Sequence, residues 1–295
     1  MKLVFVHGRS QEGREPGQLR REWILALEKG LEAIGAPQVA EDTVAFPYYG
    51  DVLFELASDT AKAESSILQD KGAAPPALGD EEQQFMQAVV FALARQHGIT
   101  DRQIAREAFG DTVELGVQNW RAVIAALRLL DLVPGVTSVS VQLIARDVWY
   151  YLTRPGLRAT VNAIVDSAIP IDEPCVIVGH SLGSIIAYNV LMDRPIRANV
   201  KRLITLGSPL GIEAIYKRLP TNSHPRKAPT GVAKWFNARA PLDAVALFEI
   251  PAQKYRGEPV VDNFSGVVND SENKHGICEY LRDSIVAGAI SNGLD

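Results

Sequence analysis

One segment, Cys175–Ala187, constrains the fold of this 295-residue chain more than any other. Four apolar residues are followed by Gly-His-Ser-Leu-Gly, centred on Ser181, and then by the small and apolar run Ser-Ile-Ile-Ala. The first run predicts a strand buried on both faces, and the last predicts a helix. The two glycines leave room for a strand and a helix that approach each other closely. The segment therefore predicts a tight strand-to-helix turn with Ser181 at its tip.

Outside a central block, predicted strands and helices alternate along the chain. Near the N-terminus, Leu3–Val6 predicts a buried strand that ends at His7-Gly8. Apolar residues spaced three and four apart from Leu19 to Ile34 then predict a helix, and Val39–Phe46 predicts a second strand. After Pro155 the alternation resumes, with predicted helices at 157–165 and 182–192, strands at 175–178, 200–206 and 232–236, and a closing helix at 280–290. Strand, helix and strand in this order indicate a parallel sheet.

The central block, residues 51–152, is predicted to be almost wholly helical. Its clearest helices are expected at Thr112–Val133 and Val139–Leu152. We therefore expect an α/β core formed by residues 1–50 and 153–295, with residues 51–152 as a helical insertion over one end of the sheet. Such an insertion could act as a lid, and the alternative is that it only adds packing mass or a dimer surface.

Composition excludes several classes of protein. The chain has 30 Lys and Arg against 35 Asp and Glu, and its basic residues do not cluster, so we expect no nucleic-acid partner. Cys175 and Cys278 form no metal-binding spacing. No apolar run is long enough for a membrane span, and the run at Leu3–Val6 is too short for a signal-peptide core. We expect a cytoplasmic protein, with contact to a membrane surface left open.

Ser181 is the candidate nucleophile of the chain. A serine at a tight strand-to-helix turn is held in a strained conformation that exposes its hydroxyl above the sheet. The N-terminus of the following helix presents the backbone N–H of Leu182 to an oxyanion formed beside that serine. The alternative is that Ser181 merely caps the helix.

A serine hydroxyl needs a base that accepts its proton and an acid that orients this base. In α/β sheets with such a turn, the acid and then the histidine follow the serine in the chain. Only His224 and His275 follow Ser181. We favour His275, in a polar loop before the closing helix, over His224, in a polar turn with no strand before it. His7 and His180 are expected to shape loops.

Three aspartates are candidates for the acid. Asp243 lies in a loop that leaves the carboxyl end of a predicted strand, between the serine and the histidine in sequence. Asp262 and Asp270 lie closer to His275 and stay open as ordinary loop acids or substitutes. We favour Asp243.

These motifs resemble the lipase and esterase branch of the α/β-hydrolase superfamily. Besides the serine motif, the resemblance rests on Val6-His7-Gly8, on Thr205-Leu206-Gly207-Ser208-Pro209, and on Trp235-Phe236-Asn237 followed by Pro241–Ala246. It implies the α/β-hydrolase fold, with a mostly parallel central sheet flanked by helices. It also implies that Asp243 is the acid and that Arg9, or else Ser10, supplies a second oxyanion N–H. The large helical block departs from a minimal bacterial esterase and leaves the substrate class open.

The expected activity is cleavage of a carboxylic ester through an acyl-enzyme on Ser181, with Asp243 and His275 completing a triad. An acyltransferase or a thioesterase would use the same three residues, and a catalytically silent binding module on the same fold is a third alternative. The chemistry needs no metal or organic cofactor. The partner is an acyl substrate, small or lipid-like, which Ser10, Tyr48 and Tyr49 are expected to contact.

Overall fold

The structure, a computed structural model, describes residues 1–61, 78–110, 120–193, 199–220 and 226–294. Its centre is a six-stranded sheet in the order β2-β1-β3-β4-β5-β6, and each neighbouring pair is parallel. This confirms the prediction of a parallel α/β sheet. The strands are β1 (Lys2–Val6), β2 (Val44–Ala45), β3 (Cys175–His180), β4 (Val200–Leu206), β5 (Trp235–Ala238) and β6 (Val261–Phe264).

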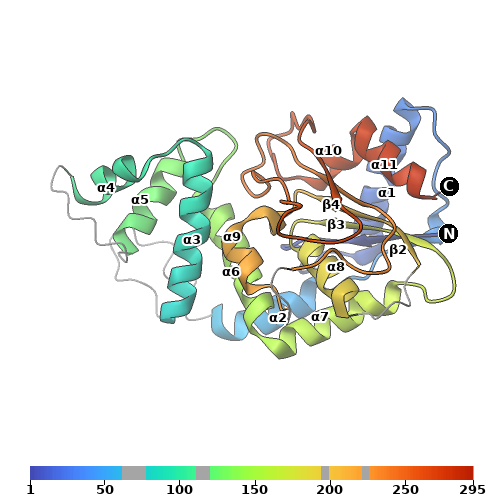
Figure 1. The fold of residues 1–295 in the computed structure, drawn as a ribbon, viewed down its shortest axis with the longest axis horizontal. Coiled ribbons are helices and arrows are strands. Elements are labelled where there is room, and N and C mark those ends of the chain that lie inside the picture. Colours follow the sequence, from blue (N-terminus) through green and yellow to red (C-terminus); the bar gives the residue numbers. More distant parts are fainter. Residues whose placement is uncertain (62–77, 111–119, 194–198, 221–225, 295) are drawn as a thin grey trace.

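Helices cover both faces of the sheet (Figure 1). The α-helices are α1 (Pro16–Ala33), α2 (Gly50–Ala61), α3 (Asp80–Gln96), α4 (Asp101–Phe109), α5 (Trp120–Leu130), α6 (Ser138–Thr153), α7 (Pro155–Ala168), α8 (Leu182–Asp193), α9 (Glu213–Arg218), α10 (Ile277–Arg282) and α11 (Ser284–Leu294). Two short 3₁₀ helices, Glu41–Thr43 and Pro209–Gly211, lie in connections.

The strands are apolar on both faces because both faces are covered. In β1, Leu3 and Phe5 belong to a core shared with α1, α10 and α11, whereas Val4 and Val6 belong to a core shared with α8. All four side chains are completely buried. Alternate residues of a strand point to opposite faces, so a continuous apolar run is what a strand between two layers requires.

A helical region, α3–α7, is inserted between β2 and β3. Helices α3, α4 and α5 lie together at the end of the molecule away from the sheet, whereas α6 and α7 lie nearer to it (Figure 1). None of the helices in the described part of the chain is long and apolar enough to cross a membrane.

Several predicted elements differ in extent from the observed ones. The strand predicted at 39–46 is reduced to β2, because a 3₁₀ helix occupies Glu41–Thr43. The strand predicted at 232–236 lies slightly later, as β5. The closing helix is two helices that meet at Asp283, whose carboxylate accepts hydrogen bonds from the first backbone N–H groups of α11. The first residues of the helix predicted at 112–133 lie outside the described residues, and α5 covers its later part.

Candidate active site

Ser181 lies between the end of β3 and the start of α8, at the predicted turn. Its φ is 54°, in the left-handed region that residues other than glycine rarely adopt. The flanking glycines explain how the chain tolerates so tight a turn. A Cβ on Gly179 would lie 2.8 Å from the carbonyl oxygen of Gly183, and one on Gly183 would lie 2.8 Å from the carbonyl carbon of Val6.

The backbone around Ser181 is held firmly, whereas its hydroxyl is left without a partner. The Ser181 N–H donates to Leu206 O at 3.0 Å, and Ser181 O accepts from the Ser184 N–H at 3.0 Å. The buried Oγ of Ser181 makes no hydrogen bond with any described residue. At the adjacent helix start, the N–H of Leu182 is among those that helix geometry leaves unpaired. A hydroxyl and a helix N-terminus therefore lie side by side.

His275 and Asp243 form a hydrogen-bonded pair. The His275 Nδ1 lies 2.8 Å from Asp243 Oδ2. Because a carboxylate can only accept, the ring hydrogen is on Nδ1, and a neutral His275 keeps a lone pair on Nε2. That Nε2 has no hydrogen-bond partner within the described ranges. This is the protonation pattern of a base available to a hydroxyl.

Asp243 stays ionised although it is completely buried. Burial alone would raise its pKa, but the charge of His275 and hydrogen bonds from His275, Tyr280 and the Val245 N–H outweigh it, so the pKa of Asp243 is lowered. The carboxylate accepts the Val245 N–H at 2.9 Å and the Tyr280 hydroxyl at 2.6 Å.

The competing candidates do not approach this pair. Asp262 and Asp270 are exposed, and Asp243 is the carboxylate that His275 contacts. His224 lies outside the described residues.

His180 supports the loop that carries His275. Its Nε2 donates to the carbonyl oxygen of His275 at 2.9 Å, and the two rings are 4.7 Å apart. Burial, and then the charge of His275, lower the pKa of His180 to about 3, so it remains neutral near pH 7. The prediction that His180 shapes a loop agrees with these contacts.

His7 fixes the loop between β1 and α1. The backbone N–H of Tyr49 donates to His7 Nε2 at 3.1 Å, so the ring hydrogen is on Nδ1, which lies 2.7 Å from Gly8 O. The Tyr49 hydroxyl donates to the carbonyl oxygen of His7. Gly8 is pressed against the serine, since a Cβ there would lie 3.0 Å from Ser181 Cβ. Tyr49 and His7 thus support the loop that lies against Ser181.

Arg9 connects the same loop to the helical region. Its Nε donates to Asp147 Oδ2 of α6 at 2.6 Å, and both side chains are largely buried, with 16% and 9% exposed. Ser10, the next residue, has a φ of 55°. Arg9 and Ser10 both line the pocket that contains Ser181.

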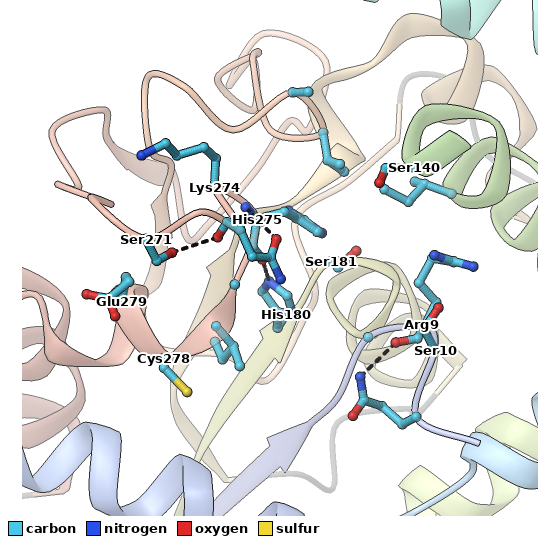
Figure 2. Close-up of a pocket in the computed structure, with 18 of the residues that line it drawn as sticks. Arg9, Ser10, Ser140, His180, Ser181, Ser271, Lys274, His275, Cys278 and Glu279 are labelled. Carbon is cyan, nitrogen blue, oxygen red and sulfur yellow. Dashed lines mark hydrogen bonds between the residues drawn. The ribbon is translucent and has the colours of Figure 1, made fainter. Parts of the chain in front are cut away.

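This pocket has a volume of about 620 Å³. Its wall combines Ser181 with the loop and helix after β1, the start of α6, the loop after β5 and residues 271–279. Figure 2 shows Ser181 between His275 on one side and Arg9 and Ser10 on the other. Neither Tyr48 nor Tyr49 is among the residues that line it; Tyr49 is completely buried and stacks on His7.

Two parts of the site were not identified from the sequence. Tyr280, on α10, donates to Asp243, and nothing in the sequence distinguishes it from an ordinary core aromatic. Ser140, Val141 and Ile144 on α6 line the pocket; the helical block was predicted to cover this end of the sheet and roof the pocket, but these residues were not singled out. Within the described residues, no group of three or more His, Cys, Asp or Glu side chains is arranged to hold a metal ion.

The fold and this arrangement together define an α/β protein with an all-parallel sheet, with a serine, a histidine and an aspartate beside one pocket. No family model, curated protein or solved structure matches the chain at a significant level. The site itself is therefore the basis on which a function can be proposed.

Proposed function

We propose that this chain is a serine hydrolase of the α/β-hydrolase fold that cleaves a carboxylic ester, with Ser181 as nucleophile, His275 as base and Asp243 as acid. One observation carries the proposal. The hydroxyl of Ser181 and the Nε2 of His275 lack partners among the described residues, and both residues line the same pocket. Buried polar atoms are normally paired, so a free donor and a free acceptor at one pocket favour a reaction between them.

In the proposed mechanism, Ser181 Oγ attacks the acyl carbonyl carbon while His275 Nε2 takes the hydroxyl proton. Asp243 orients His275 and stabilises the imidazolium that forms. His275 then gives the proton to the alcohol oxygen as the bond between this oxygen and the acyl carbon breaks, which leaves the acyl group esterified to Ser181 Oγ as an acyl-enzyme. A water molecule, deprotonated by His275, attacks the acyl carbon. The bond from this carbon to Ser181 Oγ then breaks, the carboxylic acid leaves, and His275 returns the proton to Oγ.

The tetrahedral oxyanion is assigned to the backbone N–H groups of Leu182 and Arg9. Leu182 begins α8, and the loop of Arg9 is held against Ser181 through Gly8. Each donor of this kind typically contributes a factor of about 10²–10³ to kcat. The strained backbone of Ser181 is consistent with this role, because it turns the side chain away from α8 and toward the pocket.

Labelling with a fluorophosphonate tests the nucleophile. Wild-type protein should be labelled at Ser181, and Ser181→Ala should not be labelled. Ser167→Ala is the matched control, because Ser167 is an exposed serine on α7 whose hydroxyl bonds to Ile164 O. Folded wild-type protein that takes up no label would overturn the proposal.

Turnover of short acyl esters tests the base. His275→Ala should lower kcat by at least about 10³-fold, because the serine loses its proton acceptor. His224→Ala, the alternative left by the sequence, should keep wild-type turnover. The reverse result would move the base to His224. Product analysis in water and with added alcohols then separates hydrolysis from acyl transfer.

A further inference from the structure

Tyr280 is the one side chain of the described residues, other than His275, that donates a hydrogen bond to the Asp243 carboxylate. It lies on α10, five positions after His275, and it is completely buried. It does not line the pocket, so it does not reach substrate. Its contact with Asp243 can therefore act on the acid and the base, but not on the substrate directly.

The direction of the hydrogen bonds at Tyr280 is fixed by its two partners. The backbone N–H of Ala240 donates to the Tyr280 hydroxyl at 2.9 Å. Since an N–H cannot accept, the hydroxyl hydrogen is left for Asp243 Oδ2, at 2.6 Å. Burial, and then the charge of Asp243, raise the pKa of Tyr280 well above its ordinary value. Tyr280 is thus a permanent donor.

The same carboxylate oxygen serves both Tyr280 and His275. Oδ2 of Asp243 accepts the His275 Nδ1–H at 2.8 Å as well as the tyrosine hydroxyl. A second donor stabilises the negative charge on this oxygen and weakens its pull on the imidazole. A carboxylate without that donor would bind the imidazolium more tightly and make His275 more basic.

The backbone that carries Tyr280 is packed closely against α1. A Cβ on Gly30 of α1 would be 2.5 Å from the carbonyl oxygen of Leu281, the residue after Tyr280. The tyrosine side chain is itself buried and hydrogen-bonded to both Ala240 and Asp243. A donor supported in this manner helps to keep the carboxylate in one orientation.

We infer that Tyr280 is a positioning residue of the proposed serine hydrolase, which holds Asp243 and, by sharing the Oδ2 of this carboxylate with His275, weakens the pull of Asp243 on the imidazole. The inference rests on the proposed function for its catalytic meaning. The coupling of Tyr280 to His275 through Asp243 follows from the carboxylate oxygen that the two residues share.

The other titratable or charged groups near this trio do not account for such an effect. His180, at the end of β3, remains neutral because its pKa is about 3. The guanidinium of Arg239, after β5, donates to the Ser265 hydroxyl. The Lys274 ammonium donates to Asn269 O.

The variant Tyr280→Phe tests the inference, because it keeps the ring and removes the hydroxyl. The acid limb of the kcat/KM profile should move to higher pH by roughly half a unit to one unit. kcat should fall several-fold and KM should stay within about twofold, since Tyr280 does not line the pocket.

Tyr255→Phe is the matched control. Tyr255 is also completely buried, and its hydroxyl donates to Leu210 O at 2.8 Å, away from the acid and base. It should lose a comparable amount of stability and leave the pH profile unchanged. An unshifted acid limb in folded Tyr280→Phe would overturn the inference, and Ser181 labelling would then still support the proposed function.

NMR titration of His275 gives a second readout that needs neither activity nor a stable variant. In wild-type protein, a slowly exchanging Tyr280 hydroxyl proton should change its chemical shift with the protonation of His275. A Tyr280 hydroxyl chemical shift that stays constant while His275 is protonated would overturn the coupling. This outcome would hold even if Ser181 proved unreactive.

Discussion

Gly183 shows how far a single residue determines this turn. A Cβ at this position would lie 2.8 Å from the Val6 carbonyl carbon and closer still to the Val6 and His7 oxygens, and these are backbone atoms that cannot rotate away. Gly183→Ala should therefore lower the free energy of unfolding by more than about 3 kcal/mol. This exceeds the usual cost of overpacking because the clashing atoms belong to the backbone. Urea denaturation measures this loss.

Gly156→Ala is the matched control for that prediction. Gly156 lies in the first turn of α7, and no heavy atom lies within 4 Å of where its Cβ would be. Alanine there should be neutral or raise stability by up to about 1 kcal/mol, because it restricts the unfolded chain. Equal losses for the two variants would contradict the packing argument.

The site residues could be predicted to different extents, for reasons visible in each. Ser181 stands in a local motif, and its turn depends on neighbours in sequence. Asp243 and His275 were chosen by their order along the chain, and the structure places them 2.8 Å apart. Tyr280 could not be predicted, because its hydrogen bond to Asp243 depends on how α10 packs on α1.

Tyr48 and Tyr49 were predicted to contact substrate from their loop position alone, and neither lines the pocket.

Among elements, the ion pair between Arg9 and Asp147 joins the β1–α1 loop to α6. The two side chains are mostly shielded from water, so their attraction is less screened than that of surface pairs. In a double-mutant cycle with Arg9→Gln and Asp147→Asn, we expect a coupling energy of about 1–2 kcal/mol in urea unfolding.

The exposed pair Arg95 and Asp101 is the control for this cycle. Its side chains are 57% and 59% exposed, although the Nε–Oδ1 distance is only 2.9 Å. The same cycle there should give no more than about 0.5 kcal/mol. Similar coupling energies for both pairs would show that shielding of the Arg9 pair contributes nothing.

The elements that could be predicted were those with a local apolar pattern, and the others depend on tertiary contacts. Strand β6 reads Val-Asp-Asn-Phe and has no apolar run. It is held by Asn263, whose side chain accepts from the Asn237 amide at 2.9 Å and the Ile250 N–H at 3.0 Å. A hydropathy pattern along the sequence does not reveal such a hydrogen-bond network. The break between α10 and α11, in contrast, had a sequence signal in Asp283, a residue type that favours helix N-caps.

At the scale of the whole molecule, two buried neutral histidines link stability to pH. Burial lowers the pKa of His7 to about 4 and that of His180 to about 3, below the ordinary value of 6.5. Below pH 6.5 the unfolded chain binds protons that the folded chain cannot, so stability falls as the pH is lowered. Asp243, with its lowered pKa, adds a loss at still lower pH.

Between pH 7 and pH 5 the two histidines together should remove about 4 kcal/mol from the free energy of unfolding. Urea unfolding at both pH values measures the loss, and His7→Gln should reduce it by about half. A free energy of unfolding that is the same at pH 5 and pH 7 would show that these rings are protonated in the folded protein.

The pairing of β1 with β3 has a consequence for synthesis. Lys2 pairs with Cys175, more than half of the chain later, and of the described strands only the two-residue β2 pairs with β1 from the intervening segment. The side chains of Leu3–Val6, completely buried in the finished sheet, are therefore synthesised long before the strand β3 that pairs with theirs. Between the synthesis of β1 and that of β3, the edge of β1 that later pairs with β3 is open to pairing with other strands.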